Sequence, residues 1–155
     1  MIYELKSVFT IPKLVELSKE FLPDVPHENL QSMMIERFGR DSKTFVYEEN
    51  GIPEGYVFAT VEEFNGKNQV FIQQCVVKSK EKHKEVSREL LSRVTKWAEA
   101  FGYDWVYFIT HRNPRPFMRK FGFLYHGSVL KKKVKGVKSE RPIQEQEIKA
   151  SAVSI

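Results

Sequence analysis

The 155-residue sequence lacks several features that would place it in particular protein classes. A single cysteine, Cys75, excludes an internal disulfide framework and the multi-cysteine zinc sites, and it favours a reducing compartment. The longest unbroken apolar run covers only residues 105–109, which is too short to cross a membrane. We therefore expect a cytoplasmic protein with no membrane segment and no metal site.

Acidic residues are absent from positions 105–139, which carry nine basic residues. The rest of the chain offsets part of this charge, and the net charge is +5. So basic a stretch should attract an anion, such as the phosphates of a cofactor, a nucleic acid backbone or an acidic partner. The alternative is that it forms a solvated basic face.

The pattern of apolar residues predicts an α/β fold. Helical spacing occurs at 11–21, 27–38 and 86–101, with a short helix in 113–121. Strand patterns occur at 2–8, 44–48, 55–63, 69–77, 105–109 and 123–133, and two Asn-Gly pairs mark hairpin turns at 50–51 and 65–66. This order favours one domain over 1–135, with a mixed, mostly antiparallel sheet flanked by helices, and a polar tail over 136–155.

Two strings in the second half of the chain carry a family resemblance. A strand that ends at Val77 is followed by the residues KHKEVS at 82–87 and then by a long helix. After the next strand, Asn113 precedes a short helix that ends in Gly122-Phe123. In their order along the chain these strings resemble the GNAT superfamily of acyl-CoA-dependent N-acetyltransferases, with a degenerate form of its Q/R-x-x-G-x-G/A loop. The resemblance covers residues 1–134 and implies a GNAT-like domain with splayed central strands.

The resemblance also implies a cofactor site for acetyl-CoA as co-substrate. Backbone groups of Cys75, Val76 and Val77 would hold the pantetheine arm and polarise the thioester carbonyl. The diphosphate would bind at the start of the long helix, where unpaired N–H groups and the helix dipole favour an anion. The residues assigned to this cofactor site, beyond the strand, are Lys82, His83, Lys84, Glu85, Val86, Ser87, Arg88 and Asn113.

The diphosphate loop departs from the family pattern. Glu85 stands in place of the first glycine and Ser87 in place of the second small residue, and residues 79–91 contain neither glycine nor proline. One expectation is that Ser79 caps an early helix that consumes the loop, which would favour a binding module. The other is that a loop remains before Val86 and that surrounding lysines hold the phosphates, which would favour an enzyme.

Many family members use a carboxylate on the central strand as the base, but in this sequence that strand offers Gln73 and Gln74, which cannot accept a proton. His111, at the end of the 105–109 strand, is the candidate base, since its ordinary pKa of about 6.5 suits proton transfer near neutral pH. The alternative is a histidine in a surface loop. Many family members protonate the departing thiolate with a tyrosine, and that position here is Met118.

The resulting prediction is an enzyme that transfers an acetyl group from acetyl-CoA to a primary amine by direct attack. One alternative is a catalytically inactive binding module of the same fold. Nucleic-acid binding through 105–139 ranks last, because Phe117 and Phe121, which interleave with its basic residues, are expected to face the core. Exposed strand edges of the meander make a homodimer possible.

Overall fold

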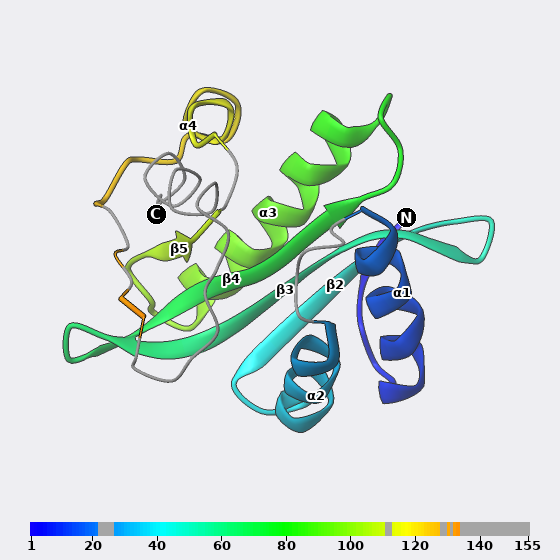
Figure 1. Cartoon of the computed structure of the whole chain (residues 1–155), viewed down its shortest axis with the longest axis horizontal. Helices are drawn as coiled ribbons and strands as arrows, with labels where there is room; N and C mark the ends of the chain where they lie inside the picture. The colour runs from blue at the N-terminus through cyan, green and yellow to red at the C-terminus, as the bar shows by residue number, and fades with distance from the viewer. Residues whose placement is uncertain (22–26, 111–112, 128–129, 131, 134–155) are drawn as a thin grey trace. The chain divides into compact units, whose positions relative to one another are not determined.

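The computed structural model describes residues 1–21, 27–110, 113–127, 130 and 132–133. Its sheet has five strands in the order β1-β2-β3-β4-β5, with helices packed against it (Figure 1). The chain divides into two compact units, 1–106 and 107–155, and β5 (Val106–Phe108) spans the boundary. The other elements of the first unit are β1 (Ile2–Glu4), the 3₁₀ helix η1 (Val8–Thr10), α1 (Ile11–Phe21), α2 (His27–Arg37), β2 (Ser42–Glu49), β3 (Ile52–Phe64), β4 (Lys67–Val77) and α3 (His83–Ala100).

The strands β2, β3 and β4 form the antiparallel meander that the sequence predicts. Asn50-Gly51 and Asn65-Gly66 make its two turns, and all four residues have positive φ angles between 52° and 78°. Positive φ at both central positions is the requirement of a type I′ hairpin turn, which asparagine followed by glycine meets at low cost. The two predicted turns are therefore confirmed.

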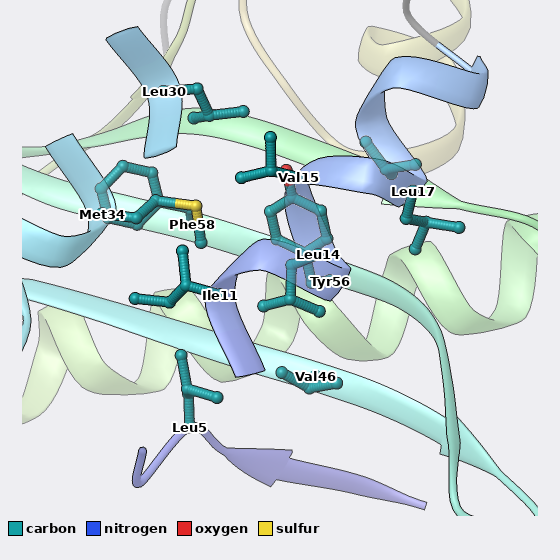
Figure 2. Packing of buried hydrophobic residues seen from close by; sticks show 11 residues of the cluster. Leu5, Ile11, Leu14, Val15, Leu17, Leu30, Met34, Val46, Tyr56 and Phe58 are labelled. Carbon is teal, nitrogen blue, oxygen red and sulfur yellow. The ribbon is translucent and has the colours of Figure 1, made fainter. Parts of the chain in front are cut away.

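One face of the meander packs against α1 and α2 (Figure 2). Tyr56 and Phe58 of β3 point to this face and are fully buried, as are Ile11 and Leu14 of α1. Each fully buried side chain of this size contributes about 1.5–3 kcal/mol relative to an exposed one. The helical spacing of the α1 residues therefore explains why α1 lies on the sheet.

The opposite face of the meander packs against α3, which contacts β2, β3 and β4 (Figure 1). Val57 and Ala59 alternate with Tyr56 and Phe58 along β3, so they point to this second face, and both are fully buried. The apolar stripe of α3 supplies the other half of this layer, through Val86, Leu90, Leu91, Val94 and Ala98. The predicted long helix is confirmed.

The second unit contains α4 (Arg115–Phe121), which was predicted. The ring of Phe117 lies 5.1 Å from that of Phe108, so Phe117 packs on an apolar residue as expected, whereas Phe117 and Phe121 are both only half-buried. The predicted strand over 123–133 is wrong for the described residues 123–127, which form no strand. Phe123 is buried there, but Leu124 and Tyr125 are more than half exposed, so little burial stabilises an extended pairing.

None of the helices in the described ranges is long and apolar enough to cross a membrane. The predicted boundary between domain and tail, at residues 135 and 136, lies outside the described residues.

Candidate functional site

The last three residues of β4 are fixed by pairing with the start of β3. Cys75, Val76 and Val77 pair with Val57, Tyr56 and Gly55, respectively. The approach is close: a Cβ atom on Gly55 would lie 2.8 Å from the carbonyl oxygen of Val76, which is shorter than real Cβ contacts allow. The lack of a side chain at Gly55 therefore lets β3 hold the end of β4 in place.

The backbone groups of this segment point to both edges of the strand. In an antiparallel pair, the N–H and C=O groups of successive residues point alternately to the two edges of the strand. Some backbone groups of Cys75, Val76 and Val77 therefore point away from β3. This arrangement fits the predicted role of these three residues.

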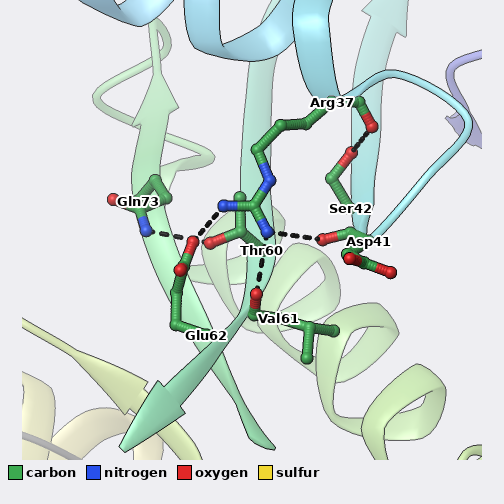
Figure 3. Close-up of polar contacts among 7 residues, drawn as sticks. All are labelled: Arg37, Asp41, Ser42, Thr60, Val61, Glu62 and Gln73. Atoms are coloured by element: carbon green, nitrogen blue, oxygen red, sulfur yellow. Dashed lines mark hydrogen bonds and ion pairs between the residues drawn. The ribbon is translucent and has the colours of Figure 1, made fainter.

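β4 is irregular just before this segment. Ile72 pairs with Ala59 and Gln74 with Phe58, so Gln73 is an extra residue in a β-bulge. The Gln73 amide donates to the hydroxyl of Thr60 at 2.9 Å, as Figure 3 shows. The Gln74 side chain is buried, and its Nε2 has no hydrogen-bond partner among the described residues.

The loop between β4 and α3 decides between the two expectations for the diphosphate site. Residues 78–82 are not helical, and α3 begins at His83. The Ser79 hydroxyl accepts a hydrogen bond from the N–H of Lys82 at 3.1 Å, as an N-cap would, but residues 80–82 form a turn instead of a helix. The expectation of a helix that starts at Ser79 is therefore wrong, and a shortened loop remains before Val86.

The first turn of α3 is open toward solvent. The first i→i−4 hydrogen bond of the helix runs from the N–H of Val86 to the carbonyl of Lys82, at 2.9 Å. The N–H groups of the preceding turn have no partner within the helix by geometry. Lys82 stands at the N-cap and makes no side-chain capping bond. An anion would therefore meet backbone donors at this point.

The predicted loop residues divide into two groups. The side chains of Val86 and Ser87 are buried against the sheet, so Ser87 meets a packing requirement for a small residue. Glu85 lies in the first turn, where its charge is favourable for the helix dipole. Among the predicted loop residues, the exposed side chains are those of Lys82, His83, Lys84, Glu85 and Arg88, and the neighbouring Lys80 and Glu81 are exposed as well.

A contact that the sequence did not predict holds Lys82. Its ammonium donates to Oε1 of Glu49 at the end of β2, and the hydroxyl of Tyr47 donates to the same oxygen. The Lys82 hydrogen bond, followed by that of Tyr47, lowers the pKa of Glu49, and Glu49 in turn raises the pKa of Lys82.

Another acidic residue, Glu62 near the end of β3, also has a partner in the fold (Figure 3). Glu62 forms an ion pair with Arg37 at the end of α2. The same guanidinium donates to the carbonyl of Val61 at 2.8 Å, and the carbonyl of Arg37 accepts from Ser42 at 2.7 Å. Glu62 therefore ties α2 to β3, and this contact accounts for the residue without a substrate.

The remaining predicted residues belong to the second unit or lie outside the described ranges. His111 is outside them. The side-chain oxygen of Asn113 accepts a hydrogen bond from the N–H of Arg115 at 3.1 Å, which forms a local turn immediately before α4. Met118 is half-buried on α4. The described residues contain no cluster of three or more histidine, cysteine or acidic side chains that could hold a metal ion.

Comparisons with known proteins agree with this geometry. The model of the acetyltransferase (GNAT) family matches residues 11–123. No curated protein sequence matches the chain. Similar solved structures include a predicted acetyltransferase with acetyl-CoA from Clostridium acetobutylicum, which has a TM-score of 0.72 and 15% identity over 86% of this chain and 96% of that chain.

Two aminoglycoside 6'-N-acetyltransferases are also similar in structure. The enzyme from Enterococcus faecium has a TM-score of 0.67 and 12% identity, over 83% of this chain and 87% of that chain. The enzyme from Acinetobacter haemolyticus has a TM-score of 0.70 and 16% identity, over 87% and 98%. These likenesses confirm the expected fold, an α/β domain in which helices flank a mixed sheet.

Proposed function

Since the chain belongs to the acetyltransferase (GNAT) family, we propose that the end of β4 and the start of α3 form its acetyl-CoA site. The protein is an N-acetyltransferase that transfers the acetyl group of acetyl-CoA to an amine. The proposal concerns the residues that perform this reaction. The observation that carries it is the non-helical segment 78–82, which follows β4 and leaves the backbone N–H groups of the first turn of α3 without partners in a preceding helical turn.

The diphosphate binds at the start of α3. The backbone donors of the first turn and the helix dipole attract it, and Lys82, Lys84 and Arg88 add positive charge. These exposed cations do the work that glycines do when a loop wraps a phosphate closely. Glu85 is exposed in the same turn and can point its carboxylate into water.

The pantetheine arm lies along the end of β4. Backbone groups of Cys75, Val76 and Val77 that point away from β3 hydrogen-bond to the amides of the arm. One of the N–H groups donates to the thioester carbonyl oxygen and stabilises the charge that develops there. The splay of the central strands that this placement requires is part of the proposal.

The reaction is a direct attack in a complex of both substrates. The lone pair of a neutral primary amine forms a bond to the thioester carbonyl carbon, and the tetrahedral intermediate then breaks its C–S bond. The amine proton passes to His111, whose ordinary pKa of about 6.5 suits this role, or to water. The CoA thiolate takes a proton from water, because Met118 has none to give.

Calorimetric titration with CoA and with acetyl-CoA tests the cofactor site. We expect micromolar binding to the native protein, and about tenfold weaker binding to the Lys82→Glu variant, because a charge-assisted contact becomes a repulsive one. The matched control is Lys96→Glu, which makes the same charge change at an exposed position nearer the other end of α3.

Two outcomes of this titration contradict the proposal. Absence of binding at millimolar ligand would remove the cofactor site and leave a protein that keeps the fold for other contacts. Equal losses for Lys82→Glu and Lys96→Glu would show that only net charge matters. If CoA binds, a screen of primary amines for thiol release identifies the acceptor.

Finer features belong to the same proposal. We place the enzyme in the cytoplasm, where acetyl-CoA is available to it. A homodimer through an exposed strand edge and a polar tail over 136–155 remain predictions from the sequence. Light scattering of the full chain and of a chain that ends at residue 135 tests both.

A further inference from the structure

We propose that Glu49 of β2 is a positioning residue that competes with the CoA diphosphate for the ammonium of Lys82. The inference rests on the cofactor site proposed above. It gives Glu49 a role in setting cofactor affinity and cofactor release, which neither the position of Glu49 in the sequence nor the family motif indicates.

The geometry places the two residues together from distant parts of the chain. Lys82 is the last residue before α3, and Glu49 is the last residue of β2, next to the turn at Asn50-Gly51. The two side chains form an ion pair across an open depression of about 540 Å³. The depression is lined by Met1, Glu48, Glu49, Asn50, Gly51 and Lys82.

The ammonium of Lys82 is therefore committed to a carboxylate and not to the start of the helix. A diphosphate bound at the first turn of α3 would present charged oxygens to the same residue. The Glu49 carboxylate and a bound diphosphate compete for the Lys82 ammonium, because the attraction is strongest at short distance and the ammonium cannot lie close to both anions at once. Lys82 is half-exposed, so it is able to move between the two partners.

The hydroxyl of Tyr47 makes this exchange inexpensive. It donates to the same Oε1 atom of Glu49 that Lys82 contacts. When Lys82 moves to the diphosphate, Glu49 therefore keeps one hydrogen bond and remains partly in water. Both hydrogen bonds hold the pKa of Glu49 below its usual value, so the carboxylate is charged at neutral pH and ready to take Lys82 back.

The consequence concerns release of the product. CoA keeps the diphosphate of acetyl-CoA, so the phosphate contacts alone would hold product as firmly as substrate. Recapture of Lys82 by Glu49 weakens those contacts each time the lysine dissociates, and it therefore speeds the departure of CoA. Product release limits the rate of many enzymes, so a competing carboxylate is a direct way to increase turnover.

The test compares CoA binding by the Glu49→Gln variant with that by the native protein, at low ionic strength where ion pairs are least screened. We expect Glu49→Gln to bind CoA about two- to five-fold more tightly, the range that an exposed ion pair supplies. Glu48→Gln is the matched control. It removes the same charge one residue away, where the side chain hydrogen-bonds to Tyr3 instead of Lys82.

A double-mutant cycle identifies Lys82 as the intermediary. Lys82→Met should weaken CoA binding by itself, and Glu49→Gln should have no further effect in that background. A purely structural or long-range effect of Glu49 would persist without the lysine. Stopped-flow displacement of CoA should show that Glu49→Gln slows dissociation.

The results separate this inference from the proposed function. If CoA binds and Lys82→Met weakens it, the cofactor site stands. Competition is then overturned if Glu49→Gln binds like Glu48→Gln, or more weakly than the native protein. If the native protein does not bind CoA, both fail. Should Glu49→Gln not fold, Glu49→Ala is used, and tighter binding is again the expected result.

Discussion

The two hairpin turns of the meander have the same sequence and the same backbone, but they have different surroundings. Both asparagines, Asn50 and Asn65, have a φ angle of 52°, and the following glycines have φ angles of 77° and 78°. Beside the first turn, Glu49 reaches the loop before α3 and binds Lys82. The backbone geometry of a turn therefore depends on its own residues, whereas the contacts made beside it depend on which other segments the tertiary structure places there.

The second hairpin has no loop residue comparable to Lys82 bound beside its turn in the described part of the chain, so it serves as a comparison for the first. It joins β3 to β4, and the rings of Phe64 and Phe71 pack edge to face there, 5.7 Å apart. Glu63 beside this turn is exposed and makes no ion pair in the described part of the chain. Equivalent substitutions at the two hairpins therefore separate the effect of a turn from the effect of its partners.

The largest expected difference between the hairpins is at Gly55, which follows the first turn and contacts the end of β4. In Gly55→Ala the new Cβ would meet the Val76 carbonyl, so we expect a loss of about 1–3 kcal/mol in the free energy of unfolding. CoA binding should weaken as well, because Val76 moves. The control Glu63→Ala at the second hairpin should change stability by less than about 0.5 kcal/mol.

Urea unfolding and CoA titration measure both effects of Gly55→Ala. A variant as stable as the native protein would show that the end of β4 adjusts without cost. Loss of stability with unchanged CoA binding would argue against the placement of the pantetheine arm along this segment.

An intermediate and equal effect is expected for Gly51→Ala and Gly66→Ala. Each introduces a side chain at a positive φ angle, which costs roughly 1–2 kcal/mol, and neither new Cβ meets a tight contact. Urea unfolding should therefore give the same loss for both. A clearly larger loss for Gly51→Ala would mean that the Glu49–Lys82 contact stabilises the fold as well as the site.

The smallest expected effect is in acid. The pKa of Glu49 is lowered by Lys82 and Tyr47, so its ionised form stabilises the folded state. This stability is complete above the ordinary carboxyl pKa of 4.5 and is lost as the pH falls through the lower value of the folded state. The native protein should therefore lose more stability below pH 4.5 than Glu49→Gln does.

Because Glu49 is exposed, this acid-dependent difference should be small and should shrink with added salt. Unfolding in urea between neutral and acidic pH measures it, with Glu63→Gln as the control at the second hairpin. Parallel stability curves for Glu49→Gln and the native protein would contradict the ion pair in solution.

Local patterns predicted most of the fold. The Asn-Gly turns and the helical spacing of 11–21 depend on neighbouring residues, and both were confirmed. The strand over 123–133 failed for residues 123–127, where Phe123 is covered by other residues but the next two apolar side chains, Leu124 and Tyr125, are exposed. Sequence spacing does not show whether such cover exists.

The candidate site was predicted less completely, for a physical reason. The strand end at Cys75–Val77 and the start of α3 follow one another in sequence, so their motif could be found. The contact of Glu49 with Lys82 joins residues 33 positions apart and depends on how β2 lies beside the loop. The bulge at Gln73 depends on the pairing with β3, and no residue type in β4 predicts it.

That bulge has a consequence for how β4 tolerates changes in length. Ile72 shares the α3 face with Ala59, whereas Gln74 shares the opposite face with Phe58, so two residues that simple alternation would put on one side lie on two. The parts of β4 before and after Gln73 therefore alternate between the two faces of the sheet in opposite phase, and the phase changes at Gln73. A residue gained or lost elsewhere in β4 would exchange the side chains of the two covered faces of the sheet, but at Gln73 it leaves the alternation on either side intact and alters only the bend between the two parts.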